Sequence, residues 1–596
     1  MVIVGDVAQR PRTIVSPLVA LGWWVCWLAV LVLPSFLLSQ APHIRLIFQQ
    51  VETTEVIPNL PWFGVVYMIW GTATLVLLVG RSDRRGSVWS DFVLVNVFAL
   101  VFWNYWNLAT PLGGLDSYYN ASIVRFVTEI GHLRPPWPPG FTYLDFPGAH
   151  LLATSLVQIT GLDVLHANWA LRLAAVHIYV TVCYVLFGHL CHSRRLALLC
   201  TLVLMVGSLT PVSSAPSWAP AILGAVLLAV AWLVVVGGTE SGMRPGRKLM
   251  FFIAASGLTV SYFVNTMMVM GIALVAYLVS AIRGRTRGGL GLGVAGLVVL
   301  VVIAWAWYEY WTAGFLSSAL TQFFRGSSLQ APTQSFQSGV IGVPWWATAS
   351  RLVWLGFLAA GTGVIVLRFF AERHRAEPVV ILSAGALFVV AGLSVVAVAA
   401  SSGGFQFHRF LLVAPLFVVP LTLGWRPMGR LVTWRSYSMG RLICGSVVAL
   451  LWFSLLPAFL LVDREIGSVS TYQAEITMSD FIHREFARYQ QIDAYAMALS
   501  QGVAPYLYAL PYASVITDEP NRSLEEFWPN LESLVARYVD TAGQGRPATF
   551  LWSEKAKGLA FKQGISPTDS HWNLLLAELD GTSRVYDNGL TALYAK

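Results

Sequence analysis

Charged residues are scarce in this sequence. They make up 11% of its 596 residues, whereas an ordinary soluble domain has about a quarter. Hydrophobic residues make up 56%, which is more apolar surface than a soluble core can bury. They gather in runs of about 16 to 23 residues, a length that crosses a hydrocarbon core roughly 30 Å thick. The composition therefore predicts a polytopic α-helical membrane protein.

Cysteine is also rare, and its placement excludes a disulfide framework and a zinc site. All five cysteines fall in or beside apolar runs, and residues 464–596 contain none. The net charge of +8 does not indicate a nucleic-acid partner, because the basic residues are spread over short loops between apolar runs. We therefore expect membrane lipid as a partner and no nucleic acid.

The arginine and lysine residues predict how the chain is threaded through the membrane. One set of alternate connections in residues 1–463 holds 20 of them, and the opposite set holds 7. Because short cytoplasmic loops are enriched in these residues, the N-terminus is predicted to be cytoplasmic. The same count makes 112–167 and 309–346 long outside loops. The thirteen candidate spans are about residues 17–38, 61–80, 91–111, 168–188, 196–211, 220–237, 249–265, 267–282, 289–308, 347–367, 378–399, 410–424 and 442–462.

Residues 464–596 have the patterning of a soluble chain, with 16 acidic and 11 basic residues. Ser523 begins a capping-box spacing that predicts a helix to about Tyr538. We expect a small α/β domain here, outside the cytoplasm. Other predicted elements are a capped helix after Ser479, buried strands at 513–517 and 549–552, and a hairpin at Asn588-Gly589.

Ionisable residues are nearly absent from the interiors of the predicted spans, which argues against a proton-coupled carrier. Polar residues cluster at the predicted outer face of the membrane. They lie in residues 115–150, near Arg172, around Glu309 and at His408-Arg409. This distribution favours a reaction at the outer interface.

Asp116 follows the third predicted span, behind flexible glycines and before Tyr118 and Tyr119. A carboxylate at this position can accept the proton of a hydroxyl group that attacks the anomeric carbon of a sugar. The structural alternative is an N-cap for the helix predicted to run through Arg125 and Glu129. The position alone leaves both interpretations open.

Two further polar sites flank the predicted spans. Asp145 and His150 flank a predicted turn, where each is either a substrate ligand or a local partner of the turn. His408-Arg409 stands at the outer boundary after the eleventh span. The Arg409 guanidinium can hold a lipid-linked phosphate with its planar fork of donors. It can equally extend to the lipid headgroups.

Taken together, these motifs resemble the GT-C superfamily of polyprenyl-phosphate-dependent glycosyltransferases. That superfamily includes protein O-mannosyltransferases, the lipid A aminoarabinose transferase and actinobacterial arabinofuranosyltransferases. Asp116 matches the family's early-loop aspartate, and residues 143–148 resemble the turn that closes the loop. Residues 170–173 resemble the arginine that opens the next span. Residues 408–411 with Pro415 resemble the late arginine element associated with the donor phosphate.

The resemblance implies transfer of a sugar from a polyprenyl-phosphate donor to an extracytoplasmic glycan, glycolipid or protein acceptor. It implies no cofactor, and it leaves the requirement for a divalent cation open. The Trp-Trp-Asp-Tyr-Gly signature of oligosaccharyltransferases is absent, because Trp345-Trp346 continues into Ala347-Thr348. A lipid or polysaccharide transporter or flippase and a non-catalytic envelope scaffold remain alternatives. The implied general base is Asp116, and the implied donor or acceptor ligands are Tyr118, Tyr119, Glu129, Asp145, His150, Arg172, His408 and Arg409.

The charge count generates a test of topology. Single cysteines introduced after Arg85, Lys248 and Arg441 should be cytoplasmic and should resist a membrane-impermeant thiol reagent in intact cells. Cysteines at Ala331 and after Lys596 should react, because both positions are predicted to lie outside. A protected C-terminus would contradict the whole arrangement.

Overall fold

The structure is a computed structural model that describes the chain in separate ranges. Asp91, Phe92, Val95, Asn96 and Ala99 are described individually, and all five are helical. The continuous ranges are 115–131, 145–206, 219–241, 244–282, 293–312, 345–371, 378–399 and 412–423, followed towards the C-terminus by 493–496, 514–517, 527–544, 548–553, 569–579, 582–587 and 591–595, with a few single residues between them.

Among the described residues, four helical segments are long and apolar enough to cross a membrane: Val164–Cys191, Pro220–Gly238, Phe263–Ala281 and Gly293–Trp311. This agrees with a polytopic helical membrane protein. The count of thirteen spans stays a prediction, because 17–38, 61–80 and 442–462 lie outside the described residues. The helices of this part are α7 (Val164–Cys191), α8 (Arg194–Val206), α9 (Pro220–Ser241), α10 (Pro245–Ser261), α11 (Phe263–Ile282), α12 (Gly293–Ala306), α15 (Trp345–Ala371), α16 (Pro378–Ala399) and α18 (Ala414–Leu423).

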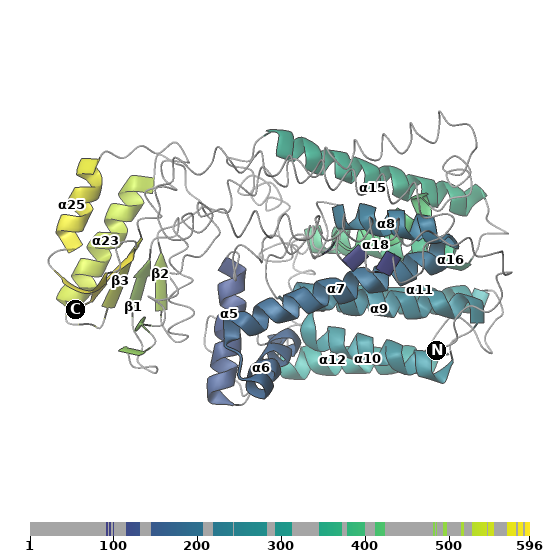
Figure 1. The fold of residues 1–596 in the computed structure, drawn as a ribbon, viewed down its shortest axis with the longest axis horizontal. Coiled ribbons are helices and arrows are strands. Elements are labelled where there is room, and N and C mark those ends of the chain that lie inside the picture. Colours follow the sequence, from purple (N-terminus) through teal and green to yellow (C-terminus); the bar gives the residue numbers. More distant parts are fainter. Residues whose placement is uncertain are drawn as a thin grey trace, which may run out of the picture. The chain divides into compact units, whose positions relative to one another are not determined.

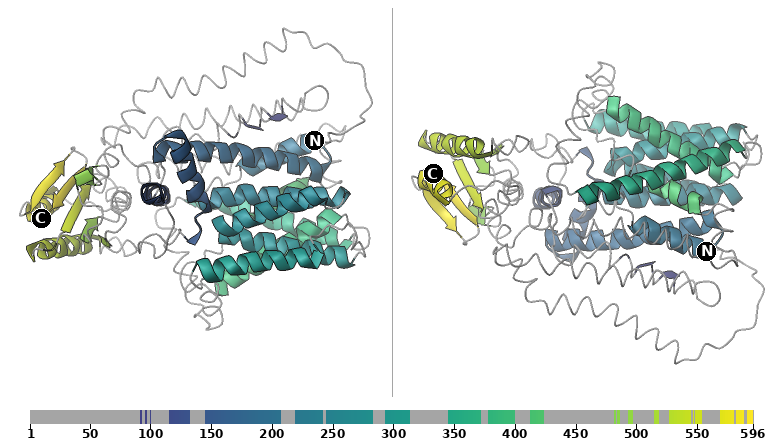
Figure 2. Two further views of the ribbon diagram at one scale, coloured as in Figure 1. Left: turned by 90° about the horizontal axis from the view of Figure 1, so that it is seen from below. Right: turned by 90° about the horizontal axis from the view of Figure 1, so that it is seen from above.

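These helices run side by side in a bundle (Figures 1 and 2). Helix α7 contacts α8 and α9, α9 contacts α10, and α11 contacts α16. Glycines allow close approach at several crossings. A Cβ added at Gly385 of α16 would overlap Val275 of α11, and one added at Gly361 of α15 would overlap Val418 of α18. Small residues at such crossings are typical of helix packing in membranes.

The boundary between α10 and α11 differs from the prediction. The sequence predicted a turn near Asn265-Thr266, whereas the helix breaks at Tyr262, whose backbone is extended. The Tyr262 N–H closes α10 by donating to the Leu258 carbonyl at 2.7 Å. The Thr266 N–H already donates to the Tyr262 carbonyl at 3.2 Å, so Asn265 and Thr266 belong to the first turn of α11.

Side-chain contacts join α7 to the helical residues that precede the Asp116 loop. Asn96 accepts a hydrogen bond from Nδ1 of His177 at 2.9 Å and donates one to Thr181 at 3.3 Å. Asp91 precedes Asn96 by five residues. It pairs with Arg194 and accepts a hydrogen bond from the Tyr184 hydroxyl at 2.9 Å. These polar pairs hold Asp91 and Asn96 against α7 and the start of α8.

Two helices lie within the predicted outside loop 112–167. They are α5 (Leu115–Ile130) and α6 (Gly148–Thr160), and they contact each other and α7. Helix α5 runs across the direction of α7 (Figure 1). The sequence predicted α5 through Arg125 and Glu129, but it did not predict α6.

The C-terminal elements form a mixed five-stranded sheet in the order β2-β1-β3-β5-β4. The strands β1, β2 and β3 are parallel, and β5 runs antiparallel to both β3 and β4. These strands are β1 (Asp493–Ala496), β2 (Ser514–Thr517), β3 (Ala548–Ser553), β4 (Ser583–Asp587) and β5 (Thr591–Ala595), and the helices are α23 (Phe527–Gly543) and α25 (Asp569–Leu579).

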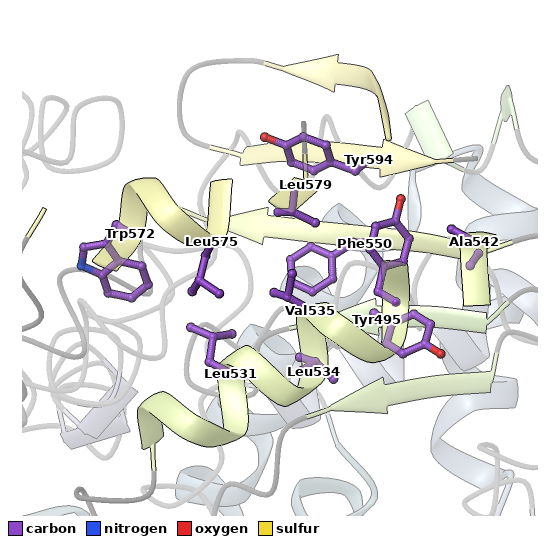
Figure 3. Packing of buried hydrophobic residues seen from close by; sticks show 12 residues of the cluster. Tyr495, Leu531, Leu534, Val535, Ala542, Phe550, Trp572, Leu575, Leu579 and Tyr594 are labelled. Atoms are coloured by element: carbon purple, nitrogen blue, oxygen red, sulfur yellow. The ribbon is translucent and has the colours of Figure 1, made fainter. Parts of the chain in front are cut away.

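Both helices share one apolar core with the sheet (Figure 3). Leu531 and Val535 of α23 meet Leu575 of α25 over Phe550 of β3. Strands β2 and β3 lie where the apolar runs predicted strands, and β4 and β5 flank Asn588-Gly589 as the hairpin prediction required. That residues 464–596 form a separate extracytoplasmic domain stays a prediction.

Two glycines of α15 provide a matched test of the helix packing. Gly361→Ala should destabilise the protein by about 1–3 kcal/mol, because the new methyl group overlaps Val418 and lies 2.6 Å from Oγ1 of Thr422. Gly363→Ala has nothing within 4 Å of its methyl group and should stabilise α15 by up to about 1 kcal/mol. Thermal unfolding of both variants in one detergent measures the contrast. Equal melting temperatures would contradict the α15–α18 contact.

Candidate active site at one end of the bundle

Helix α5 carries Asp116 in its first turn. Asp116 is the second residue of α5, which begins at Leu115, and its N-cap interpretation stays an alternative. Tyr118 and Tyr119 belong to the same helix. Glu129 lies thirteen residues after Asp116, or roughly 20 Å along a helix, and it pairs with Arg125 at 3.3 Å. The fold therefore does not bring Glu129 together with Asp116.

The turn at Asp145 is held against two other elements. Its carbonyl accepts a hydrogen bond from the Trp307 indole at 3.2 Å, and the Phe146 ring lies 6.0 Å from the Tyr308 ring. Helix α6 then begins at Gly148, where an added Cβ would overlap the Ser261 hydroxyl of α10. Glycine is required at this position because α6 and α10 approach so closely.

His150 is a buried residue of α6. Its Nε2 donates to Oδ1 of Asn120 on α5 at 2.8 Å, and both side chains are buried. Burial lowers the pKa of His150 from 6.5 to about 4. The imidazole is therefore neutral at physiological pH, which lets it donate to Asn120 without carrying charge. Asn120 lies four residues after Asp116, so this bond joins α6 to α5 one turn from Asp116.

Arg172 lies inside α7 and is 2% exposed. Helix α7 begins at Val164, earlier than predicted, because the Asp163 side chain caps it by accepting from the backbone N–H groups of Leu165 and His166 at 2.8 and 3.1 Å. Asn168 precedes Arg172 by one turn and is 1% exposed. Since residues four apart share one face of a helix, both side chains lie on the same side of α7.

A short π-helix, η2 (Trp307–Trp311), continues from the end of α12. Tyr308 is fully buried there, and its ring packs edge-on at 5.1 Å against Phe263 at the start of α11. Trp307 and Trp311 stack at 5.1 Å. Isolated π-helical turns are frequent at functional sites. Glu309 lies in this turn, where the sequence indicated polarity without assigning a role.

These elements converge at one end of the bundle. Helices α5, α6 and α7 contact one another, and α6 also contacts α10. The hydrogen bond from Trp307 to the Asp145 carbonyl adds η2 to this group. The residues of this candidate site that the sequence analysis did not assign are Asn120, Asn168 and Tyr308. Asn120 and Asn168 each stand one helical turn from a predicted site residue, Asp116 and Arg172, and that spacing is the pattern that indicates them. His408 and Arg409 lie outside the described residues.

Within the described part of the chain, no group of three or more His, Cys, Asp and Glu side chains is arranged to hold a metal ion. The chemistry that the described residues can supply is a carboxylate at the start of α5, neutral hydrogen-bonding groups on α5, α6 and α7, and one buried guanidinium on α7. A buried guanidinium suits an anion such as a phosphate.

No protein-family model matches the sequence, and no curated protein matches it. Among solved structures, the chain is similar to ArnT from Cupriavidus metallidurans bound to undecaprenyl phosphate. The TM-score is 0.48 and the identity is 16%, over 85% of this chain and 98% of that chain. The Archaeoglobus fulgidus oligosaccharyltransferase in its apo form has a TM-score of 0.48 and 12% identity, over 80% of this chain and 71% of that chain.

The pKa of His150 predicts how stability depends on pH. Folding lowers the pKa of His150 from 6.5 to about 4. Between pH 6.5 and pH 4, His150 is therefore protonated in the unfolded chain and neutral in the folded chain. The contribution of neutral His150 to the free energy of unfolding is fully present above pH 6.5 and is lost as the pH drops towards 4. The contribution between pH 7 and pH 5 is about 2 kcal/mol.

His150→Gln should remove this contribution while keeping a donor for Asn120. Thermal unfolding at pH 7 and pH 5 should therefore show a smaller loss of stability for the variant than for the wild type. Parallel pH curves for the two proteins would show that His150 titrates normally.

Proposed function

We propose that the protein is a membrane glycosyltransferase that moves a sugar from a polyprenyl-phosphate donor to an extracytoplasmic glycan, glycolipid or protein acceptor. The hydrogen bond between Asn120 and His150 carries the proposal. It ties α5, the helix of Asp116, to α6, and both helices contact α7, the helix of Arg172. A carboxylate and a phosphate-binding cation from separate segments are thus candidates for one site.

The proposed reaction assigns Asp116 as the general base. Its carboxylate takes the proton from the acceptor hydroxyl as that oxygen forms a bond to the anomeric carbon of the donor sugar. The bond between the anomeric carbon and the phosphate oxygen breaks, and the polyprenyl phosphate leaves with the electron pair. General-base catalysis of this kind contributes on the order of 10² to 10⁴ in rate.

The cations of the proposed site stabilise the leaving phosphate. Arg172 is buried, so its guanidinium acts in an environment of low dielectric, where its attraction to a phosphate is stronger than in water. Arg409, which lies late in the sequence of the predicted membrane part, has the same proposed role. The proposal gives Asp145 and His150 positioning roles, because Asp145 binds η2 through its carbonyl and neutral His150 fixes Asn120.

Asp116→Asn tests the proposed base. The substitution keeps the size of the side chain but removes the proton acceptor, so transfer from a polyprenyl-phosphate sugar to the acceptor should fall by about 10² or more. The measurement uses purified protein in detergent or nanodiscs. Thermal unfolding serves as the folding control, since the loss of a carboxylate near a helix N-terminus costs only about 0.3–1 kcal/mol.

Glu129→Gln is the matched control, because it removes a carboxylate from the same helix at a distance from Asp116. It should leave transfer within about twofold of wild type, since an exposed ion pair such as Arg125–Glu129 contributes little. Wild-type transfer by a well-folded Asp116→Asn protein would exclude Asp116 as the base. Asp145→Asn would then be the next variant to measure.

A further inference from the structure

Asn168 is a buried polar side chain that none of the described residues satisfies. It is 1% exposed, and neither Oδ1 nor Nδ2 of its carboxamide has a hydrogen-bond partner. Burying an amide without hydrogen bonds costs free energy that other packing must offset. Unsatisfied buried groups are rare in folded proteins, and each requires an explanation such as a ligand.

The position of Asn168 along α7 relates it to the membrane boundary. Helix α7 has 28 residues, so it is about 42 Å long and exceeds a hydrocarbon core of roughly 30 Å by about one turn at each end. With α7 centred, Asn168 lies at the outer boundary of the hydrocarbon and Arg172 lies about 6 Å deeper. The two side chains share one face of the helix.

We propose that Asn168 and Arg172 form a two-part subsite for the lipid-linked donor, in which Arg172 binds the phosphate and Asn168 binds hydroxyl groups of the sugar. This subsite rests on the glycosyltransferase function proposed above. Its new element is the assignment of sugar recognition to Asn168.

The chemistry of the two side chains supports this division. A guanidinium only donates hydrogen bonds and carries a permanent charge, which suits a phosphate. A carboxamide both donates and accepts, which suits a pair of sugar hydroxyls that also do both. In a polyprenyl phosphate the sugar lies beyond the phosphate, further from the hydrocarbon. The side chain one turn closer to the outside therefore meets the sugar.

The chain offers a matched control in Asn265. This residue is also 1% exposed, and neither of its amide atoms has a hydrogen-bond partner among the residues that the structure describes. It lies on α11 against Gly224 of α9, where an added Cβ would come within 2.7 Å of Nδ2. The residue four positions on is Val269, so no cation shares its face. Asn265 thus has the burial of Asn168 without the phosphate-binding partner.

Asn168→Leu and Asn265→Leu test the subsite. Leucine has the same branching at Cγ but no polar atoms, so removing the unsatisfied carboxamide should raise the melting temperature of the ligand-free protein by about 1 °C or more in both variants. Binding is then measured in nanodiscs with two probes. One is undecaprenyl phosphate, and the other is undecaprenyl phosphate bearing one sugar, chosen from a panel of pentose and hexose adducts as the adduct that the wild type binds most tightly.

The wild type should bind this adduct more tightly than undecaprenyl phosphate. Asn168→Leu should lose roughly tenfold in affinity for the adduct, from two hydrogen bonds, and keep its affinity for undecaprenyl phosphate. Arg172→Ala should weaken both probes, and Asn265→Leu should change neither. Asn168→Ala, which also removes both polar atoms, is the second variant should the leucine variant fail to assemble, and it should lose the same selectivity.

The outcomes separate the two proposals. An unchanged affinity ratio in Asn168→Leu, or a wild type that binds both probes equally, overturns the subsite and leaves the glycosyltransferase function standing. A wild type that binds neither probe overturns the function and the subsite together.

Discussion

A side-chain hydrogen bond between two buried polar groups joins the parts of the candidate site. His150 and Asn120 are thirty residues apart in sequence and 2.8 Å apart in space. Because both are buried in an apolar bundle, removing one leaves the other unsatisfied, at a cost of about 1–3 kcal/mol. Through this bond the helix of Asp116 is fixed to α6, and the close approach at Gly148 fixes α6 to α10.

The requirement that buried polar groups be hydrogen-bonded also explains why Asn168 differs from its neighbours. Hydroxyl groups in the bundle mostly satisfy themselves by donating to the carbonyl four residues back, as Thr259, Ser280 and Thr422 do at 2.8 to 3.0 Å. A carboxamide has both a donor and an acceptor to satisfy, and within the described part of the chain Asn168 satisfies neither. Burying this carboxamide without hydrogen bonds destabilises the fold, and such costs are concentrated at functional sites. The cost at Asn168 is therefore consistent with its proposed recognition of a sugar.

The patterns that could be predicted from sequence were the local ones. The apolar run 378–399 coincides with α16, because a bilayer sets the length of such runs. The wrong predictions concern boundaries. Asn265-Thr266 has turn-prone side chains, but they open α11, and the break falls at Tyr262. Helix α6 was missed because Pro147 and Gly148 indicate a turn when they are read alone, whereas here they begin a helix.

By itself the sequence determined that the chain is a helical membrane protein, since composition and run length are set by the surrounding lipid. It also identified Asp116, Asp145, His150 and Arg172 as polar residues at a predicted interface. Only the tertiary structure decided which of these elements meet. Contacts such as His150 with Asn120, Trp307 with the Asp145 carbonyl and α5 with α7 depend on how the helices cross, because crossing is set by packing between distant segments and leaves no local pattern in the chain.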